Sequence, residues 1–343
     1  MGKKGFVLGG GAFITEGQTR YVLAIVNLDA WMPSAERIPL DFLAHGIAFD
    51  PNDGHRAVMF EKKGPGACVV DLRSRKVVRS ISTASSRQFY GHGAFSRDGA
   101  LLYATESRLD REFEGVLVVR DAKTFDELGT LPTHGTAPHD CQIINDGKTM
   151  VIANGGGPPH GSAPSVTYVD LQTNKLLERI TLRSPKFNTG HVAVSSLGDL
   201  AIVSAPRDGL PTPNQQLGAV TLRPVGSMAT TVTKPNKVIQ RMLGETLSVE
   251  INEEQRIVLA THPLGDCVSV WKLDDVAFIE TLELRGPRGV ATTLDGEWYV
   301  VSHLTENNVR LTALSVSTRK PIGVHVEPSF TTGSHLFVHD LAS

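Results

Sequence analysis

The stretch His45-Gly-Ile-Ala-Phe-Asp-Pro-Asn-Asp-Gly54 decides the fold, because its pattern returns twice, each time 47 residues further along the chain. The later copies are His92-Gly-Ala-Phe-Ser-Arg-Asp-Gly99 and His139-Asp-Cys-Gln-Ile-Ile-Asn-Asp-Gly147. Each copy begins with histidine, continues as a short apolar strand and ends in an Asp-Gly turn. Repeats with a period of about 40 to 50 residues are typical of β-propellers.

Four weaker copies extend the repeat to the end of the chain. They begin at His191, Thr246, Arg288 and His335, and successive starts lie 42 to 55 residues apart. Each repeat contains three or four short β-rich runs separated by turn signals, which predicts a four-stranded antiparallel blade. The sequence therefore predicts an all-β fold, a seven-bladed β-propeller.

Both ends of the chain are expected to share the last blade. Its repeat, residues 333–343, supplies only the inner strand, whereas residues 1–44 contain three β-rich runs that can complete it. Closing the ring in this way removes exposed sheet edges. We expect one domain over residues 1–343, with blades one to six over residues 45–332.

The composition excludes several classes of protein. Of the 343 residues, 41% are hydrophobic and 20% are charged, which is enough apolar surface for a packed core. The net charge of −2 gives no basic surface for nucleic acid, and no apolar run is long enough to span a membrane. The three cysteines lie far apart, which argues against a disulfide framework. No phosphate-binding glycine motif is present, so no nucleotide cofactor is expected.

The inner strands are predicted to carry a ring of histidines. The first strand of each propeller blade lines the central channel, so the residues that begin these strands share one face. They are His45, His92, His139, His191, Glu245 or Thr246, Arg288 and His335. Neutral imidazole is a ligand for copper, iron, zinc and nickel, so the five histidines are candidate metal ligands.

A second, polar ring is expected beside the histidines. The second strand of each blade returns to the same face 13 to 16 residues later, at Glu61, Glu106, Asn154, Ser204, His262 and His303. Carboxylates among them can orient ligand histidines. Tyr90 is a candidate hydrogen-bond donor, and Arg288 can hold an anionic substrate. The alternative is that repeated histidines are structural and bond to neighbouring blades.

The repeats resemble a bacterial β-propeller family of unknown function. The segments that carry the resemblance are Leu43 to Ala48, Phe89 to Glu106, Pro138 to Asp140, Val151 to Gly156 and Ser334 to Leu336. The family falls among the YVTN-repeat, quinoprotein-amine-dehydrogenase-like propellers. The resemblance implies a periplasmic protein encoded beside imelysin-type metal-uptake proteins, which are the partners it suggests. The chain shows no recognisable leader, so a cytoplasmic location is the alternative.

A looser similarity concerns the hub. Nitrous oxide reductase and the methanethiol-oxidase-like propellers are similar in placing copper on hub histidines. We therefore expect a transition metal ion, copper or iron with zinc as a further possibility.

Three functions follow from these patterns. The first is a metal-binding propeller in bacterial iron or copper handling. The second is a metal-dependent oxidoreductase or lyase that uses the same site, with the catalytic residues unassigned. The third is a non-catalytic scaffold that binds a partner protein. The metal hypothesis also predicts loss of metal as the pH falls through about 6.5, where free imidazole takes up a proton.

Overall fold

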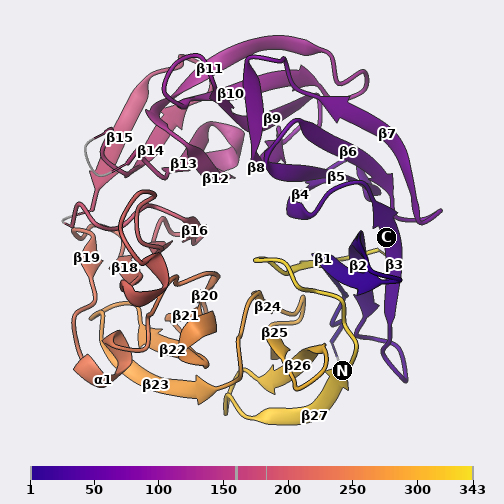
Figure 1. The fold of residues 1–343 in the computed structure, drawn as a ribbon, viewed down its shortest axis with the longest axis vertical. Coiled ribbons are helices and arrows are strands. Elements are labelled where there is room, and N and C mark those ends of the chain that lie inside the picture. Colours follow the sequence, from indigo (N-terminus) through magenta and orange to yellow (C-terminus); the bar gives the residue numbers. More distant parts are fainter. Residues whose placement is uncertain (1, 159–160, 183, 342–343) are drawn as a thin grey trace.

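The computed structural model describes residues 2–158, 161–182 and 184–341, and its sheets stand side by side in a ring around a central channel (Figure 1). Short polar and glycine-containing turns join strands in which apolar residues are buried, as expected for stacked β-sheets. The chain is an all-β propeller.

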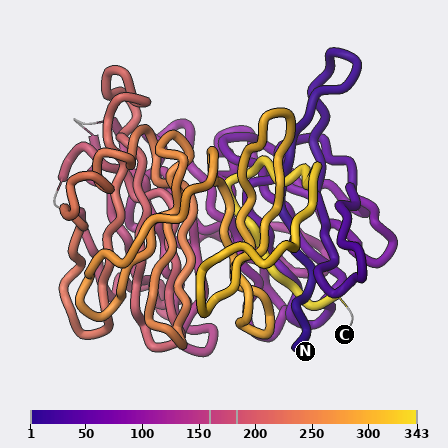
Figure 2. The backbone as a smooth tube through the Cα atoms, turned by 90° about the horizontal axis from the view of Figure 1, so that it is seen from below, coloured from indigo at the N-terminus to yellow at the C-terminus, as the bar shows by residue number. Residues whose placement is uncertain are grey.

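One sheet combines the two ends of the chain. It contains β28 (Phe337–His339), β1 (Phe6–Thr15), β2 (Gln18–Asn27) and β3 (Ala35–Leu40), in that order. Strand β28 pairs antiparallel with the start of β1, from Phe6 opposite His339 to Leu8 opposite Phe337. The tube view shows both termini close together at one edge of the molecule (Figure 2).

The next eight strands form a single wide sheet. They are β4 (Ala44–Asp50), β5 (Asp53–Gly64), β6 (Gly66–Asp71), β7 (Lys76–Ser82), β8 (Arg87–Phe95), β9 (Leu101–Arg108), β10 (Glu114–Asp121) and β11 (Glu127–Thr136).

Four further four-stranded sheets complete the ring. The first two contain β12 (Pro138–Ile144), β13 (Thr149–Asn154), β14 (Ser165–Asp170) and β15 (Leu176–Thr181), then β16 (His191–Val194), β17 (Leu200–Ser204), β18 (Ala219–Arg223) and β19 (Thr230–Thr231). The last two contain β20 (Val249–Asn252), β21 (Ile257–His262), β22 (Cys267–Lys272) and β23 (Phe278–Glu283), then β24 (Val290–Thr292), β25 (Trp298–Leu304), β26 (Val309–Ser315) and β27 (Pro321–Val326).

Helical structure is confined to short pieces in the connections. They are α1 (Asn236–Ile239) and the 3₁₀ turns η1 (Asn145–Gly147), η2 (Pro213–Gln215) and η3 (Pro263–Gly265). Among the described residues, no helix has the length and apolar character needed to cross a bilayer.

The prediction of seven blades is wrong. The described residues form five separate four-stranded blades, and the strands expected to make two more are joined in the eight-stranded sheet. The cause is β5, which is 12 residues long and runs past its partner β6. Its far end pairs with β8, with Lys62 opposite Tyr90 and Gly64 opposite Phe89.

The hydrophobic core lies between neighbouring sheets. Leu8 and Leu23 of the terminal sheet pack with Met59 and Val70 of the wide sheet, and all four are fully buried. Corresponding clusters fill the other spaces between sheets, the largest buried side chain being Trp271. Packing around the ring holds the inner strands in fixed positions beside the channel.

Candidate metal centre

Five histidines from five different inner segments meet on the axis of the propeller. His45 lies in β4, His92 in β8, His139 in β12 and His191 at the start of β16, while His335 precedes β28. The imidazole centroid of His45 lies 5.0 to 5.2 Å from those of the other four. The structure therefore brings all five predicted histidines into one buried cluster.

The glycines beside these histidines make room for the rings. A Cβ atom on Gly91, whose φ is +117°, would lie 2.6 Å from Cδ2 of His45. A Cβ atom on Gly46 would lie 2.5 Å from the carbonyl oxygen of Gly91 and 2.8 Å from Nδ1 of His92. Side-chain atoms do not approach this closely, so Gly46 and Gly91 allow the first two inner strands to crowd together at the cluster.

The ring nitrogens converge closely enough to share an ion. His45, His92, His191 and His335 each offer a ligand nitrogen, and these four atoms lie within 4.8 Å of one another. Nε2 of His45 also lies 3.0 Å from Nε2 of His139 and 3.1 Å from Nε2 of His191. Since metal–imidazole bonds are about 2.0–2.1 Å, ligands on opposite sides of one ion are about 4 Å apart. Small rotations of the rings therefore suffice to surround a cation.

Polar contacts at Nδ1 favour a free Nε2 on two of the rings. Nδ1 of His92 lies 3.1 Å from Oδ1 of Asp140, and Nδ1 of His191 lies 2.5 Å from the carbonyl oxygen of Leu247. The carbonyl oxygen of Leu247 can only accept, so Nδ1 of His191 donates and its Nε2 presents a lone pair. The carboxylate beside Nδ1 of His92 favours the same tautomer for that ring. A carboxylate behind a histidine is a common arrangement around bound metals.

Two ring nitrogens of the cluster have no partner among the described residues, as is also true of Nε2 of His134 outside the cluster. Among the described residues, Nε2 of His92 and Nε2 of His335 are buried and make no hydrogen bond. Buried polar atoms are nearly always paired, so orphaned atoms call for an explanation such as a bound ion. The orphaned nitrogens and the favoured Nε2 lone pairs show that the donor set fits a transition metal cation.

The histidines are held neutral by their surroundings. Burial, followed by the positive charge of Lys62, lowers the pKa of His92 to about 3. Burial also lowers the pKa of His335 to about 3, with the neighbouring His92 as the next cause. The pKa values of His45, His139 and His191 fall well below 6.5, mainly through burial. Neutral imidazole is the form that binds metal.

The carboxylate that contacts the cluster is Asp140, which the sequence reasoning missed. Its Oδ2 accepts the backbone N–H of Val192 at 2.9 Å, which directs Oδ1 toward His92. Burial raises the pKa of Asp140 to about 6. The available signal was its place directly after His139, where the two preceding repeats carry glycine.

Most residues of the expected second ring make their contacts away from the histidine cluster. Glu106 is buried between Arg87 and Arg120, which donate to it at 2.8 and 2.9 Å. Glu61 accepts the backbone N–H of Gly66 at 3.0 Å and lines a cavity that also contains His45.

Of the remaining members of that ring, Asn154, His262 and His303 have hydrogen-bond partners, whereas the buried Oγ of Ser204 has none among the described residues. Asn154 donates to Thr167 at 2.9 Å, and Ser204 is buried at the end of β17. Each ring of the other two histidines has partners at both nitrogens. His262 lies between Thr246 and Ser269, and His303 lies between the carbonyl oxygen of Leu304 and Thr312. These residues serve the packing of the sheets.

A basic residue lies over one side of the cluster. Lys62, which the sequence reasoning missed, lines two cavities on this side, one with His139 and one with His45. Burial lowers its pKa to about 8, while nearby Glu245 opposes the shift. Arg288 lines the His45 cavity, of about 530 Å³. Tyr90 lines the His139 cavity, and its ring centroid is 6.0 Å from that of His139.

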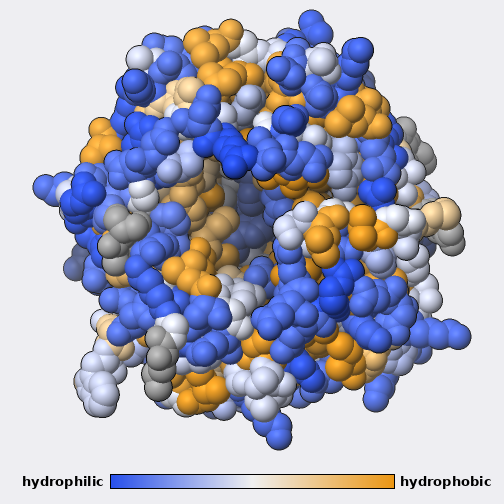
Figure 3. All heavy atoms as spheres, turned by 180° about the vertical axis from the view of Figure 1, so that it is seen from behind, coloured by the Kyte–Doolittle hydropathy of each residue, from blue (hydrophilic) through white to orange (hydrophobic). Residues whose placement is uncertain are grey.

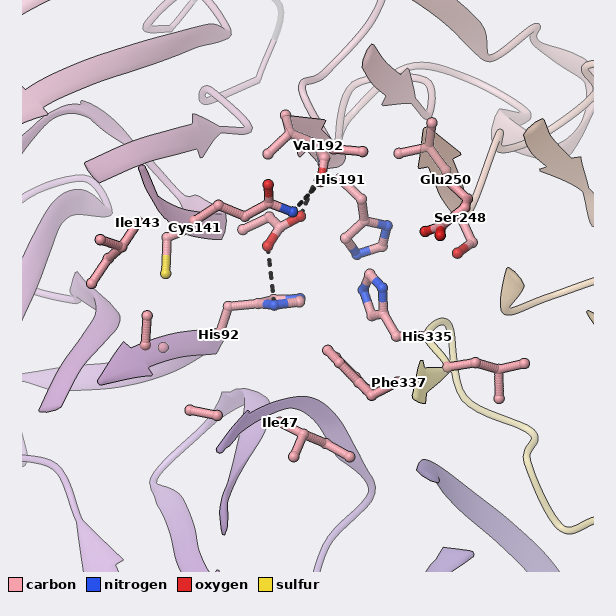
Figure 4. Close-up of a pocket in the computed structure, with 18 of the residues that line it drawn as sticks. Ile47, His92, Cys141, Ile143, His191, Val192, Ser248, Glu250, His335 and Phe337 are labelled. Carbon is pink, nitrogen blue, oxygen red and sulfur yellow. Dashed lines mark hydrogen bonds and ion pairs between the residues drawn. The ribbon is translucent and has the colours of Figure 1, made fainter. Parts of the chain in front are cut away.

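The other side of the cluster opens into a cavity of about 540 Å³. His92, His191 and His335 line it, together with Asp140 and Glu250. The close-up shows the three imidazoles pointing toward one another, with Glu250 and Ser248 beside His191 (Figure 4). Burial raises the pKa of Glu250 to about 7. Seen from behind the view of Figure 1, the surface is hollowed at the centre of the ring (Figure 3).

Comparison with solved structures shows a similar fold. A chain of Kuenenia stuttgartiensis hydrazine synthase superposes with a TM-score of 0.66 and 15% sequence identity, over 87% of this chain and 92% of that chain. At this identity the likeness concerns the fold alone. No curated protein matches the sequence. The sequence profile described as "Protein of unknown function (DUF1513)" matches residues 38–330, so the chain belongs to the DUF1513 family.

Proposed function

We propose that the protein binds a transition-metal cation at the histidine cluster and acts in the handling of iron or copper. The observation that carries this proposal is the pair of orphaned, buried Nε2 atoms on His92 and His335, which face the lone pairs of the neighbouring rings. An all-imidazole donor set suits copper, iron and zinc better than magnesium or calcium, which prefer oxygen ligands.

The proposed ligands are His45, His92, His191 and His335, with His139 as a fifth ring in contact with His45. Asp140 favours the tautomer of His92 that leaves Nε2 free. Burial keeps the rings neutral, so binding does not require the displacement of protons from them.

Elemental analysis tests this proposal. Protein purified without an affinity tag or chelator is compared with the double variant H92Q/H335Q, and both are also reconstituted with Cu²⁺, Fe²⁺ or Zn²⁺. We expect near-stoichiometric metal in the wild type and its loss in the variant. His325→Gln is the matched control, because His325 is exposed on β27. Absence of metal from the reconstituted wild type would contradict the proposal and favour a plain interaction scaffold.

A second candidate function is a metal-dependent oxidoreductase or lyase. The observation that favours it is that cavities reach the cluster from both sides of the channel. An anionic substrate in the 530 Å³ cavity would meet Arg288 and Lys62 on its way to His45. Turnover that is lost in Arg288→Gln while metal content is unchanged would support this function.

We further propose a periplasmic location and metal-uptake proteins as partners. Both proposals rest on the resemblance to exported propellers. Fractionation of cells that produce the native chain tests the location, and recovery in the cytoplasm would contradict it.

A further inference from the structure

The two sides of the histidine cluster differ in charge. The described residues that line the 540 Å³ cavity include the carboxylates of Asp140 and Glu250 and neither lysine nor arginine. The cavities on the opposite side contain the basic residues Lys62, Lys63 and Arg288 together with the acidic residues Asp41, Glu61, Asp208 and Glu245. A cation approaching the cluster therefore meets two very different environments.

On this opposite side, Lys62 opposes the approach of a cation. The charge of Lys62 lowers the pKa values of all five histidines, so its positive potential extends over the whole cluster. Acidic residues line this side too, but Asp208 forms an ion pair with Lys63. The negative charge of Glu245 opposes the lowering of the pKa values of both Lys62 and Arg288. Lys62 acts on all five rings, whereas Lys63 acts on His139 and Asp140 acts on His335.

The acidic side is open to a cation. Glu250 lies in β20, and its Oε1 accepts the backbone N–H of Thr292 at 3.1 Å. No basic side chain within the described ranges forms an ion pair with Glu250 at 4.0 Å or less. Because burial raises the pKa of Glu250 to about 7, most of this carboxyl group is ionised at pH 8, where its negative charge attracts a cation.

The orphaned ring nitrogens face the same cavity. His92 is 6% exposed, and its Nε2 has no partner among the described residues. His335, whose Nε2 is also unpartnered there, lines the cavity with it. Figure 4 shows these two rings and His191 grouped on one side of Glu250. The carboxylate and the free nitrogens thus lie along one path.

We propose that the metal enters through the acidic cavity, where Glu250 captures the hydrated cation and passes it to His92, His191 and His335. This inference rests on the proposed metal-binding function. Asp140, which already contacts His92, adds negative charge at the inner end of the same path. The cavities on the opposite side, which Lys62 lines, remain available to neutral or anionic molecules.

The rate of metal uptake tests the route. Apo protein is mixed rapidly with Zn²⁺ at pH 8, where Glu250 is mostly ionised, and the disappearance of free Zn²⁺ is followed with a zinc-sensitive dye at low and high ionic strength. We expect Glu250→Gln to slow association by about tenfold at low salt, with a smaller effect at high salt, because steering by charge changes rates by 10-fold or more and is screened by ions. The dissociation rate should be nearly unchanged, since Glu250 is not a final ligand.

Two variants serve as controls. Glu254→Gln removes the same charge from an exposed turn after β20 and should leave the rate unchanged. Lys62→Gln should keep or increase the rate. An unaltered rate in Glu250→Gln, or slower uptake in Lys62→Gln, would overturn the route while leaving the metal site intact. Absence of uptake by the wild type, or equal uptake by H92Q/H335Q, would instead overturn the proposed function.

Discussion

The free Nε2 of His92 depends on one carboxylate. Asp140 contacts Nδ1 of His92 through Oδ1 and accepts the backbone N–H of Val192 through Oδ2, so both of its oxygens are engaged. Asparagine offers only one. We expect Asp140→Asn to weaken metal binding by about 10- to 100-fold, the range found when such orienting groups are lost. Competition titration against a chelating dye measures the change.

The control for this variant is Asp146→Asn. Asp146 is exposed and pairs only with the exposed Arg97, so its removal should leave the affinity unchanged. Equal affinities of Asp140→Asn and the wild type would show that Asp140 does not set the tautomer of His92.

The buried histidines also make the apo protein sensitive to acid. Their pKa values are lowered on folding, so below about pH 6.5 the unfolded chain binds protons that the folded chain does not. The stability associated with the neutral rings is therefore complete above pH 6.5 and is lost progressively toward pH 3. At pH 5, the neutral rings of His92 and His335 should each lower the free energy of unfolding by about 2 kcal/mol. The melting temperature of the apo wild type should fall more steeply between pH 7 and pH 5 than that of apo H92Q/H335Q.

The same shifts change the expectation for metal release. The sequence alone predicts release near pH 6.5, where free imidazole is protonated. Burial lowers the pKa values of the ligand rings, so competition by protons on the folded protein begins at a lower pH. We expect dialysed protein that stays folded to retain metal at pH 5.5. Complete loss of metal at pH 6, with the β-rich circular dichroism unchanged, would contradict the assigned environment of the rings.

Between elements, one buried carboxylate joins two neighbouring blades. Asp199, in the turn between β16 and β17, is fully buried and pairs with Arg256 in the turn between β20 and β21. The hydrogen bond from Arg256 lowers the pKa of Asp199 to about 2. This contribution is present above about pH 4 and is lost as the pH falls through 2. We expect Asp199→Asn to lower the free energy of unfolding by about 2 kcal/mol at pH 7.

Chemical denaturation at neutral pH measures this loss. Asp275→Asn is the control, because Asp275 and its partner Lys272 are both exposed, and such pairs contribute little. A change below about 0.5 kcal/mol in Asp199→Asn would show that the pair is not a structural link between the blades.

Strand patterns predicted the all-β propeller class, because each copy of the repeat contains its own strands and turns. The patterns did not predict where the sheet that contains β5 ends, and the predicted number of separate blades was wrong. Whether β5 ends beside β6 or reaches β8 depends on the pairing of Lys62 and Gly64 with residues more than 20 positions away. The histidine positions followed from the repeat, whereas the role of Asp140 depends on its contact with β16 across a sheet boundary.

At the scale of the whole molecule, the ring closes in the sheet that pairs β28, from the end of the chain, with β1, from its start. Strand β28 contributes its pairing with β1 and the flanking buried side chains Leu336 and Leu341. Removal of residues 336–343 keeps His335 but exposes the edge of β1 and deletes both leucines. Each fully buried leucine contributes about 1.5–3 kcal/mol, a large share of the 5–15 kcal/mol that stabilises a typical domain. We expect this truncation to lower the melting temperature by more than about 10 °C and to promote aggregation through the open edge. Removal of residues 1–3 is the control, because, of the described residues that it deletes, Lys3 contributes a partly exposed ion pair with Asp340. Metal affinity should fall in the first truncation alone, since only there does the segment that carries His335 lose its anchor. Equal stability of the two truncated proteins would show that the ring does not depend on β28 for its closure.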